Sequence, residues 1–326
     1  MHTTSQTRPL TAKRTIDDSP NSWRNIKKNK YLLLLLIPGV VYFIIFHYLP
    51  MYGVLIAFKD FKMMAGRSFI ENVLQSPWVG LENFRLFIES PQFNRVIVNT
   101  VILSLLQLIF GFPIPIMFAL LLNEIRIAKY KKFVQTVSYL PHFLSIVATV
   151  GMLKLILSPS SGIVNSILVD WFGLEPQYFF GDARWFRALY VGSGIWQDFG
   201  FSAIIYLAAL SKVDPHLYES AVIDGASRLQ RMRYITLPAL KTTIVVLFIL
   251  QMGNMMSIGA EKVLLMYSPS TYETADVIAT FVYRRGLVEM DYSFGAAVGL
   301  FNTVINIIFL VVANRLSRRF TGESLY

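Results

Sequence analysis

The chain contains few side chains suited to covalent chemistry, and they form no recognisable catalytic pattern. It has no cysteine, which excludes disulfides, thiol chemistry and cysteine-ligated metal sites. The four histidines lack metal-ligand spacing, and no Ser/His/Asp or paired-carboxylate arrangement stands out. No Gly-x4-Gly-Lys-Ser/Thr segment is present, so the chain has no nucleotide-binding loop. We therefore expect a protein that is not an enzyme and holds no metal or cofactor of its own.

Polar side chains within long apolar segments are the next candidates, because burying them in lipid is costly. Asp198 and its neighbour Gln197 either line a water-filled cavity or pair with another helix. Gln251 and Asn254 either face a solute pathway, where they would bond sugar hydroxyls, or hold helices together.

Aromatic and basic residues in these segments have two interpretations as well. Tyr190 and Trp196 offer rings for sugar stacking, although membrane-interface belts explain such aromatics equally well. Lys154 fits a side chain that reaches from a helix end to the interface. Asn302 and Asn306 share one helix face, and we expect them to serve packing.

The composition is that of a polytopic membrane protein. Hydrophobic residues make up 54% of the 326 residues and charged residues only 15%, against about 25% in soluble domains. Several apolar runs approach the ~20 residues that a bilayer-spanning helix needs. We predict an all-α fold, because backbone in lipid must satisfy its own hydrogen bonds. The six expected spans are 31–50, 96–122, 133–157, 187–210, 239–258 and 293–313.

The distribution of charge predicts the orientation of these spans. The segments 1–30, 123–132, 211–241 and 314–326 contain 19 of the 30 Lys and Arg residues. Basic residues concentrate on the cytoplasmic side, so we expect both termini there. We divide the chain into a cytoplasmic tail (1–30, with a possible interfacial helix at 23–30), a first span and outer loop (31–95), a five-helix core (96–313) and a cytoplasmic tail (314–326). The first span is expected to be retained and not cleaved as a signal peptide.

Two apolar stretches outside the spans are too short to cross a bilayer. The segment following Trp78 is amphipathic up to Ser90 and predicts a short interfacial helix before the second span. The piece from Ile163 to Phe172, which ends at Gly173, also predicts an interfacial helix.

The segment 214–238, which we call the coupling loop, predicts two short helices with a sharp bend. Asp214 can cap the first helix, which is expected to run to about Ile223. Gly225 permits the bend, Ser227 can cap the second helix, and Pro238 is expected to end it.

The coupling loop resembles the EAA loop of the membrane-spanning subunits of ATP-binding-cassette (ABC) importers. That pattern is Glu-Ala-Ala, two residues, Asp-Gly-Ala, a spacer and Ile-x-Leu-Pro. The matching positions are Glu219, Ala221, Asp224, Gly225, Ala226, Ile235, Leu237 and Pro238. Ser220 stands at the second position of the pattern and Met232 at one that is often Phe. The alternative is an ordinary basic loop that only satisfies the positive-inside rule.

The resemblance implies that these ten residues contact a partner ATPase subunit. Glu219 would make a polar contact with it, Ala221 and Ala226 would allow close approach, and Gly225 would permit the bend. Leu237 and Pro238 would tie the loop to the fifth span. Met232 would fill an apolar socket.

Further segments are similar to polysaccharide and oligosaccharide permeases of the alginate and aldouronate type. These segments begin at Trp196, Glu261 and Tyr272, and the segment from Val79 to Phe84 resembles sugar permeases more broadly. The resemblance implies the type I importer permease fold in a bacterial inner membrane. It also implies a second homologous permease, two ATPase subunits that hold ATP and Mg, an external solute-binding protein and an oligosaccharide substrate, possibly acidic. No nucleic acid is expected as a partner.

Two other function classes remain as alternatives. A proton-coupled secondary carrier would use Asp198 and Lys154, but such carriers commonly show internal repeats, and none is visible. A membrane-anchored enzyme or scaffold would need an active constellation or a soluble domain, and neither is present in the sequence.

Overall fold

The computed structural model describes residues 30–322, 324 and 325. The expected N-terminal tail and interfacial helix at 23–30 therefore lie outside the described residues, except for Lys30. Every regular element within the described part is helical, apart from one isolated bridge between Lys59 and Trp78, which confirms the all-α prediction. The chain divides into two compact units, Met1–Tyr52 and Gly53–Tyr326.

The first unit is described from α2 (Lys30–Phe43), which continues as the π-helix η1 (Ile44–Tyr48). η1 buries no residue, and the large apolar side chains of α2 are exposed as well. A helix whose described side chains are apolar and exposed suits a lipid environment. The 3₁₀-helix η2 (Leu49–Phe58) crosses from the first unit into the second.

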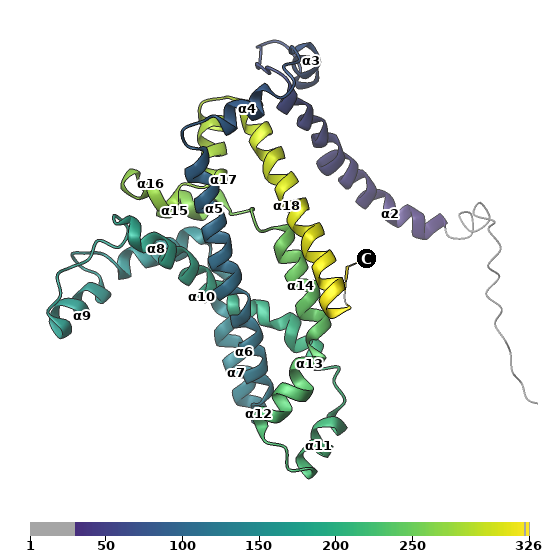
Figure 1. Ribbon diagram of the computed structural model, residues 1–326, viewed down its shortest axis with the longest axis vertical. Helices are drawn as coiled ribbons and strands as arrows, with labels where there is room; N and C mark the ends of the chain where they lie inside the picture. The colour runs from purple at the N-terminus through teal and green to yellow at the C-terminus, as the bar shows by residue number, and fades with distance from the viewer. Residues whose placement is uncertain (1–29, 323, 326) are drawn as a thin grey trace, which may run out of the picture. The chain divides into compact units, whose positions relative to one another are not determined.

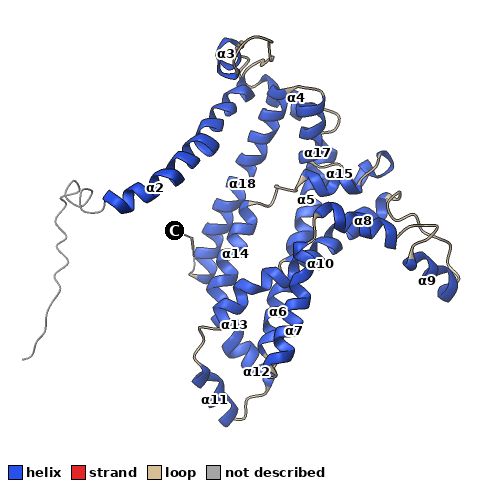
Figure 2. Ribbon diagram, turned by 180° about the vertical axis from the view of Figure 1, so that it is seen from behind, coloured by secondary structure: helices blue, strands red, loops and turns tan. Residues whose placement is uncertain are grey.

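The second unit is built on three long helical rods. The first consists of α5 (Phe93–Leu106), the π-helical turn η3 (Gln107–Gly111) and α6 (Pro113–Asn123). The other two are α10 (Ala183–Leu210) and α18 (Tyr292–Thr321). α10 packs along α6, and α14 (Lys241–Gly253) packs along α18, as both views show (Figures 1 and 2). η3 precedes Pro113, whose missing N–H cannot complete the regular helical ladder.

Short helices gather at the two ends of this unit. One end holds α3 (Phe69–Gln75), α4 (Glu82–Ile88), α17 (Ile278–Val282) and the π-helix η7 (Tyr283–Val288) (Figure 1). The other end holds α11 (Pro215–Ile223) and α12 (Arg228–Arg231) (Figure 1). α9 (Ile163–Phe172) ends at Gly173, which has φ +64°. Helices are thus confirmed where the sequence predicts short apolar ones, as α4 and α9.

The predicted third span, 133–157, is not one continuous helix. α7 (Ala128–Tyr139) and the 3₁₀ turn η4 (Leu140–Phe143) are separated from α8 (Ile146–Ile156) by a bend of 98°. Pro141 lacks the N–H that would continue α7, and the Ser145 side chain accepts a hydrogen bond from Ala148 N, 3.1 Å away, to start α8. The span expected here stays a prediction, and the structure shows that its helix is broken at this point.

Among the described residues, three helices are long and apolar enough to cross a membrane: Leu33–Phe58, Phe93–Asn123 and Tyr292–Phe320. The count rises to five if two bent pairs are each one span, the second pair being Arg228–Ala239 with α14, at 59°. α10 is not among them, although its 28 residues would extend about 42 Å, because its middle is polar. The prediction of six spans therefore stays a prediction.

A buried ionic cluster joins helices that are far apart in the sequence. Asp276 is 0% exposed and pairs with Arg95 at 2.9 Å and with Arg284 at 2.8 Å. Asn99 Nδ2 donates to the Asp276 carbonyl at 3.0 Å. Thr280 Oγ1 donates to the Asp276 carboxylate at 2.9 Å. These five residues, the Asp276 cluster, link α5 to α17 and η7.

The remaining short helices lie between α14 and α17 in the sequence. They are α15 (Ala260–Met266), the 3₁₀ turn η6 (Pro269–Thr271) and α16 (Tyr272–Ala275). α15 packs against α8 and α10, and its Val263 and Met266 are buried in the cluster around Leu103 and Phe186. This packing places α15 beside the middle of α10.

Candidate functional site

The coupling loop has the bend that its sequence predicts. The Asp214 carboxylate accepts a hydrogen bond from His216 N at 3.0 Å and caps α11, which ends at Ile223. Gly225 follows with φ +78°, a conformation that glycine adopts without strain. Ser227 and Gln230 form a reciprocal capping box at the start of α12.

The end of the loop differs from the prediction, because Pro238 does not end the second helix. α12 continues through the π-helix η5 (Met232–Thr236) into α13 (Leu237–Ala239). Within η5, Leu237 N donates to the Met232 carbonyl, so the wider turn precedes the proline and accommodates its missing N–H. The chain turns only after Ala239, at the 59° bend into α14.

The coupling loop exposes apolar side chains although it is rich in polar residues. Leu217, Val222 and Leu229 are all more than half exposed, and Ile223 is 85% exposed. Neighbouring apolar side chains on such a loop are typical of a surface that a partner covers. Of the matched positions, Ser220, Asp224, Leu237 and Pro238 are exposed and Ala221, Ala226 and Ile235 are half-buried.

Glu219 lies on the exposed face of α11 at the edge of a cavity. Its carboxylate is 3.1 Å from His216 Nδ1, one turn earlier. The cavity has a volume of about 510 Å³ and is also lined by Glu124, Arg126 and Arg231. Both members of the His216–Glu219 pair are largely exposed, so their contact does not hold the Glu219 carboxylate in one fixed position.

Contacts that the sequence did not reveal hold the coupling loop together and pack its end against neighbouring residues. Tyr218 Oη lies 3.2 Å from Thr236 Oγ1, which is fully buried, and Arg231 donates to the Ala226 carbonyl at 3.0 Å. Met232 packs against the buried cluster that includes Leu240. Movement of α11 would therefore be transmitted to η5 and the start of α14.

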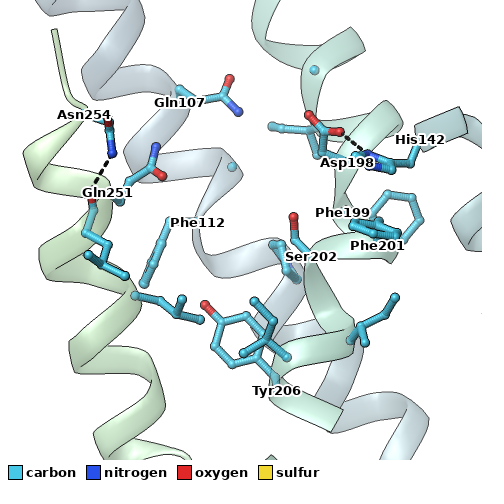
Figure 3. Close-up of a pocket in the computed structure, with 18 residues that line it drawn as sticks. Gln107, Phe112, His142, Asp198, Phe199, Phe201, Ser202, Tyr206, Gln251 and Asn254 are labelled. Carbon is cyan, nitrogen blue, oxygen red and sulfur yellow. Dashed lines mark hydrogen bonds and ion pairs between the residues drawn. The ribbon is translucent and has the colours of Figure 1, made fainter. Parts of the chain in front are cut away.

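A second candidate site is a cavity of about 760 Å³ on one face of α10 (Figure 3). Its polar lining comes from four different elements: Gln107 from η3, His142 from η4, Asp198 and Ser202 from α10, and Gln251 with Asn254 from the end of α14. Phe112, Phe199, Phe201 and Tyr206 add aromatic surface. Polar groups that converge with aromatic rings suit a solute rich in hydroxyl groups.

Two consecutive residues of α10 hold the bend between η4 and α8. The Asp198 carboxylate lies 2.9 Å from His142 Nδ1 (Figure 3). Gln197 Nε2 donates to the Leu144 carbonyl at 2.8 Å. The His142 ring stacks on Phe201 with ring centroids 3.9 Å apart and an angle of 7°. Asp198 therefore lines the cavity and also pairs with His142 of η4. The two interpretations that the sequence offered for Asp198 are thus compatible.

Two smaller cavities share lining residues with the first. One, of about 120 Å³, is lined by Gln107, Tyr190, Gln251 and Asn254. The other, of about 470 Å³, is lined by Gln107, Tyr190, Gln197, Asp198 and Lys262, among others. We call this last one the Lys262 cavity.

Five of the six predicted pathway residues therefore line these cavities: Tyr190, Gln197, Asp198, Gln251 and Asn254. Trp196, 40% exposed, lines none of the three. Asn306 serves packing as predicted, since its side chain accepts from Met256 N at 2.8 Å and donates to Ser257 Oγ at 2.9 Å.

Sequence reasoning missed Gln107, His142 and Lys262. His142 stands beside Pro141 inside an expected span and so carried a signal of its own, whereas Lys262 follows Glu261 in a short helix and did not stand out. Burial lowers the pKa of Lys262 to about 8, and the negative charge of Asp198 opposes that shift. α15, which carries Lys262, is outside the candidate spans.

Residues 86–322 match the family model of the binding-protein-dependent transport system inner membrane component. The chain belongs to this family. It is thus a multi-pass membrane protein and a permease component of an ABC importer, as the coupling loop predicts, and not an enzyme.

Relatives of known assignment agree over nearly the whole chain. The polygalacturonan/rhamnogalacturonan transport system permease protein YteP of Bacillus subtilis is 45% identical over 92% of this chain and 91% of its own. The protein LplB of the same organism is 43% identical over 92% of both chains. A solved bacterial ABC transporter involved in the import of the acidic polysaccharide alginate is 44% identical, with a TM-score of 0.83 over 92% of this chain and 99% of that chain. The type I permease fold and a role in sugar import are therefore shown.

Proposed function

We propose that this permease imports oligosaccharides that carry carboxylates and that the coupling loop transmits the work of a partner ATPase. The observation that carries the first part is the set of connected cavities beside α10, whose lining combines amides, aromatic rings and one lysine. We choose acidic sugars as the substrate class because the relatives at 45% and 44% identity are a polygalacturonan/rhamnogalacturonan permease and an alginate transporter. Their similarity extends over the helices that line these cavities.

The chain supplies half of the pathway, and a second homologous permease supplies the other half. The Gln107 and Asn254 amides and the aromatic rings form one open lining and do not enclose a solute from all sides. An external solute-binding protein delivers the oligosaccharide. A solved alginate transporter has been captured in complex with an alginate pentasaccharide-bound periplasmic protein. That chain is 43% identical to this one over 93% of this chain and 99% of its own length.

The coupling loop is the contact with the ATPase subunits, which bind ATP and Mg. Its support is the exposed apolar face of α11, with Ile223 at its end, beside the exposed carboxylate of Glu219. An ATPase pair that closes on ATP would move α11, and the Tyr218–Thr236 contact would carry that movement to η5 and α14. ATP drives the conformational change only as far as it favours one state of the ATPase pair over the other.

Uptake into proteoliposomes that contain the complete transporter tests the transport part. Labelled trigalacturonate, a uronate trisaccharide, is expected to enter only when ATP and the binding protein are both present. Uptake that continues without ATP and collapses with an uncoupler would instead favour a proton-coupled carrier. Uptake of neutral oligosaccharides with no uptake of the uronate would remove the acidic substrate class.

The coupling part is tested by Glu219→Ala, with Glu175→Ala as the control for loss of an exposed carboxylate elsewhere. Loss of Glu219 is expected to lower ATPase co-purification or substrate-stimulated hydrolysis several-fold, whereas Glu175→Ala leaves both unchanged. Normal co-purification and normal stimulation in Glu219→Ala would refute the coupling role.

A further inference from the structure

Lys262 is a cation that no carboxylate of the described residues pairs with. Its Nζ donates to the Tyr190 carbonyl at 2.9 Å and lies 4.8 Å from the centroid of the Tyr190 ring. No carboxylate among the described residues lies within 4 Å of it. An ammonium group has three donors, so the Tyr190 carbonyl leaves two of them available.

The acids nearest to this lysine are occupied elsewhere or point away. Asp198 lines the same cavity, but its carboxylate pairs with His142 at 2.9 Å. Glu261 also lines the cavity, yet it is exposed and does not reach Nζ. Asp198 acts on Lys262 through its negative charge but forms no direct ion pair with it, so the ammonium group can pair directly with a carboxylate of a ligand.

The surroundings leave room for such a ligand. The Lys262 cavity has a volume of about 470 Å³, and it joins the larger cavity through Gln107, Gly194 and Asp198. A Cβ placed on Gly194 would lie 3.2 Å from Lys262 Nζ and 3.5 Å from Gln107 Oε1. The lysine and the Gln107 amide therefore converge on one point, which glycine keeps open.

We propose that Lys262 binds the carboxylate of an acidic sugar residue as the oligosaccharide passes α10, with the Gln107 amide bonding the adjacent hydroxyl. This inference rests on the proposed function, because it assigns one residue to read the charge of the substrate. The ammonium donates two hydrogen bonds to the carboxylate and keeps its bond to the Tyr190 carbonyl. A charge-assisted contact of this kind is stronger than one between neutral groups. Burial lowers the pKa of Lys262, which is consistent with a partly desolvated cation that forms no ion pair with the described carboxylates.

The first test compares uptake of trigalacturonate by the complete transporter with Lys262→Gln, Lys262→Arg and Lys154→Gln. Lys262→Gln is expected to lower uptake about tenfold or more, and Lys262→Arg to retain most of it. Lys154 is exposed on the neighbouring helix α8, so its loss should leave uptake unchanged. Unchanged uptake in Lys262→Gln would overturn the proposal.

The second test measures binding directly and does not depend on delivery or on ATP. Lysine side chains of the complete transporter are acetylated with an amine-reactive ester, and the labelling of Lys262 is quantified by mass spectrometry. Trigalacturonate should protect Lys262 several-fold, whereas its methyl ester, which has the same rings without the charges, should not. Lys154 serves as an internal reference. Equal protection by both sugars, or none by either, would overturn the carboxylate contact.

The two proposals fail in different ways. If the wild-type transporter imports no trigalacturonate, the acidic substrate class fails, and the protection of Lys262 then decides whether it binds carboxylates. If wild type imports the uronate while Lys262→Gln imports it equally well, only the role of Lys262 fails.

Discussion

Two groups of charged side chains lie beside α10 and differ in how their charges are matched. Asp276 is fully buried and has two arginines within 2.9 Å. Lys262 is half-buried and has only a carbonyl and a ring as neighbours. Lys262 and Asp276 lie outside the candidate membrane spans, whereas Arg95 lies in the candidate span Phe93–Asn123.

The comparison separates a charge that stabilises the fold from one that is available to a ligand. A buried carboxylate with satisfied partners holds its elements together, and its removal leaves the partners uncompensated. A cation that lines a cavity and lacks a carboxylate can change partner without disturbing the fold. We therefore expect substitutions at Asp276 to affect stability and those at Lys262 to affect transport.

The largest effect is expected from Asp276→Ala. It leaves Arg95 and Arg284 without their counter-charge and should cost about 3 kcal/mol of stability, since breaking a buried pair typically costs 3–5 and both arginines are partly exposed. Thermal unfolding of the purified transporter measures it. The control is Asp60→Ala, whose pair with Lys62 is exposed and should matter by less than about 1 kcal/mol. Similar losses in both variants would remove the distinction.

The packing of α10 against α7 is tested by Gly200→Ala. A Cβ at Gly200 would overlap the Ser138 carbonyl of α7, whereas one at Gly192, on the same helix, would meet nothing within 4 Å. We expect Gly200→Ala to cost about 1–3 kcal/mol through overpacking. Gly192→Ala should be neutral or stabilising by up to about 1 kcal/mol. Equal melting temperatures would show that α7 and α10 are not closely packed here.

The charge state of Lys262 makes uptake of an acidic sugar dependent on pH. With a pKa of about 8, Lys262 is charged below this value and loses its charge as the pH rises through it. Uptake at subsaturating trigalacturonate should therefore fall about tenfold from pH 7 to pH 9. Asp198, His142 and Glu261 line the same cavity as Lys262, and the Tyr190 carbonyl accepts its hydrogen bond.

Lys262→Arg supplies the control for that profile. Arginine stays charged over this range, so the variant should lose no more uptake than the binding protein and ATPase themselves lose. A decline in Lys262→Arg as steep as in wild type would assign the pH dependence to another group.

The coupling loop could be predicted from the sequence because its structure is local. The Asp214 cap, the Gly225 bend and the Ser227 capping box each depend on residues within a few positions of one another. The exception is Pro238, where the expectation was that proline ends a helix. The π-helical turn η5 precedes Pro238 and lets the helix continue through it. A wider turn of this kind has no clear sequence signature.

The cavities beside α10 could be predicted only in part. Asp198, Gln251 and Asn254 were found because each is polar within an apolar segment. His142, which pairs with Asp198, lies 56 positions away from it, and Lys262, which lines a cavity with Asp198, comes from another helix. One sequence does not show which segments meet. The 98° bend at Leu144 was missed for the same reason, since Gln197 of α10 stabilises it.

The smallest effect is expected from Thr280→Val, which changes the surroundings of Asp276 without removing a charge. The hydroxyl donates to the Asp276 carboxylate at 2.9 Å and accepts from Val277 N at 3.0 Å. Both arginine contacts remain, so the loss should be about 1 kcal/mol, measured by thermal unfolding beside Asp276→Ala. Thr303→Val, at an exposed threonine of α18, is the control for losing a hydroxyl. A loss in Thr280→Val as large as that in Asp276→Ala would mean that hydrogen bonds, and not the two ion pairs, hold the cluster, and the contrast with Lys262 would then not be one of charge.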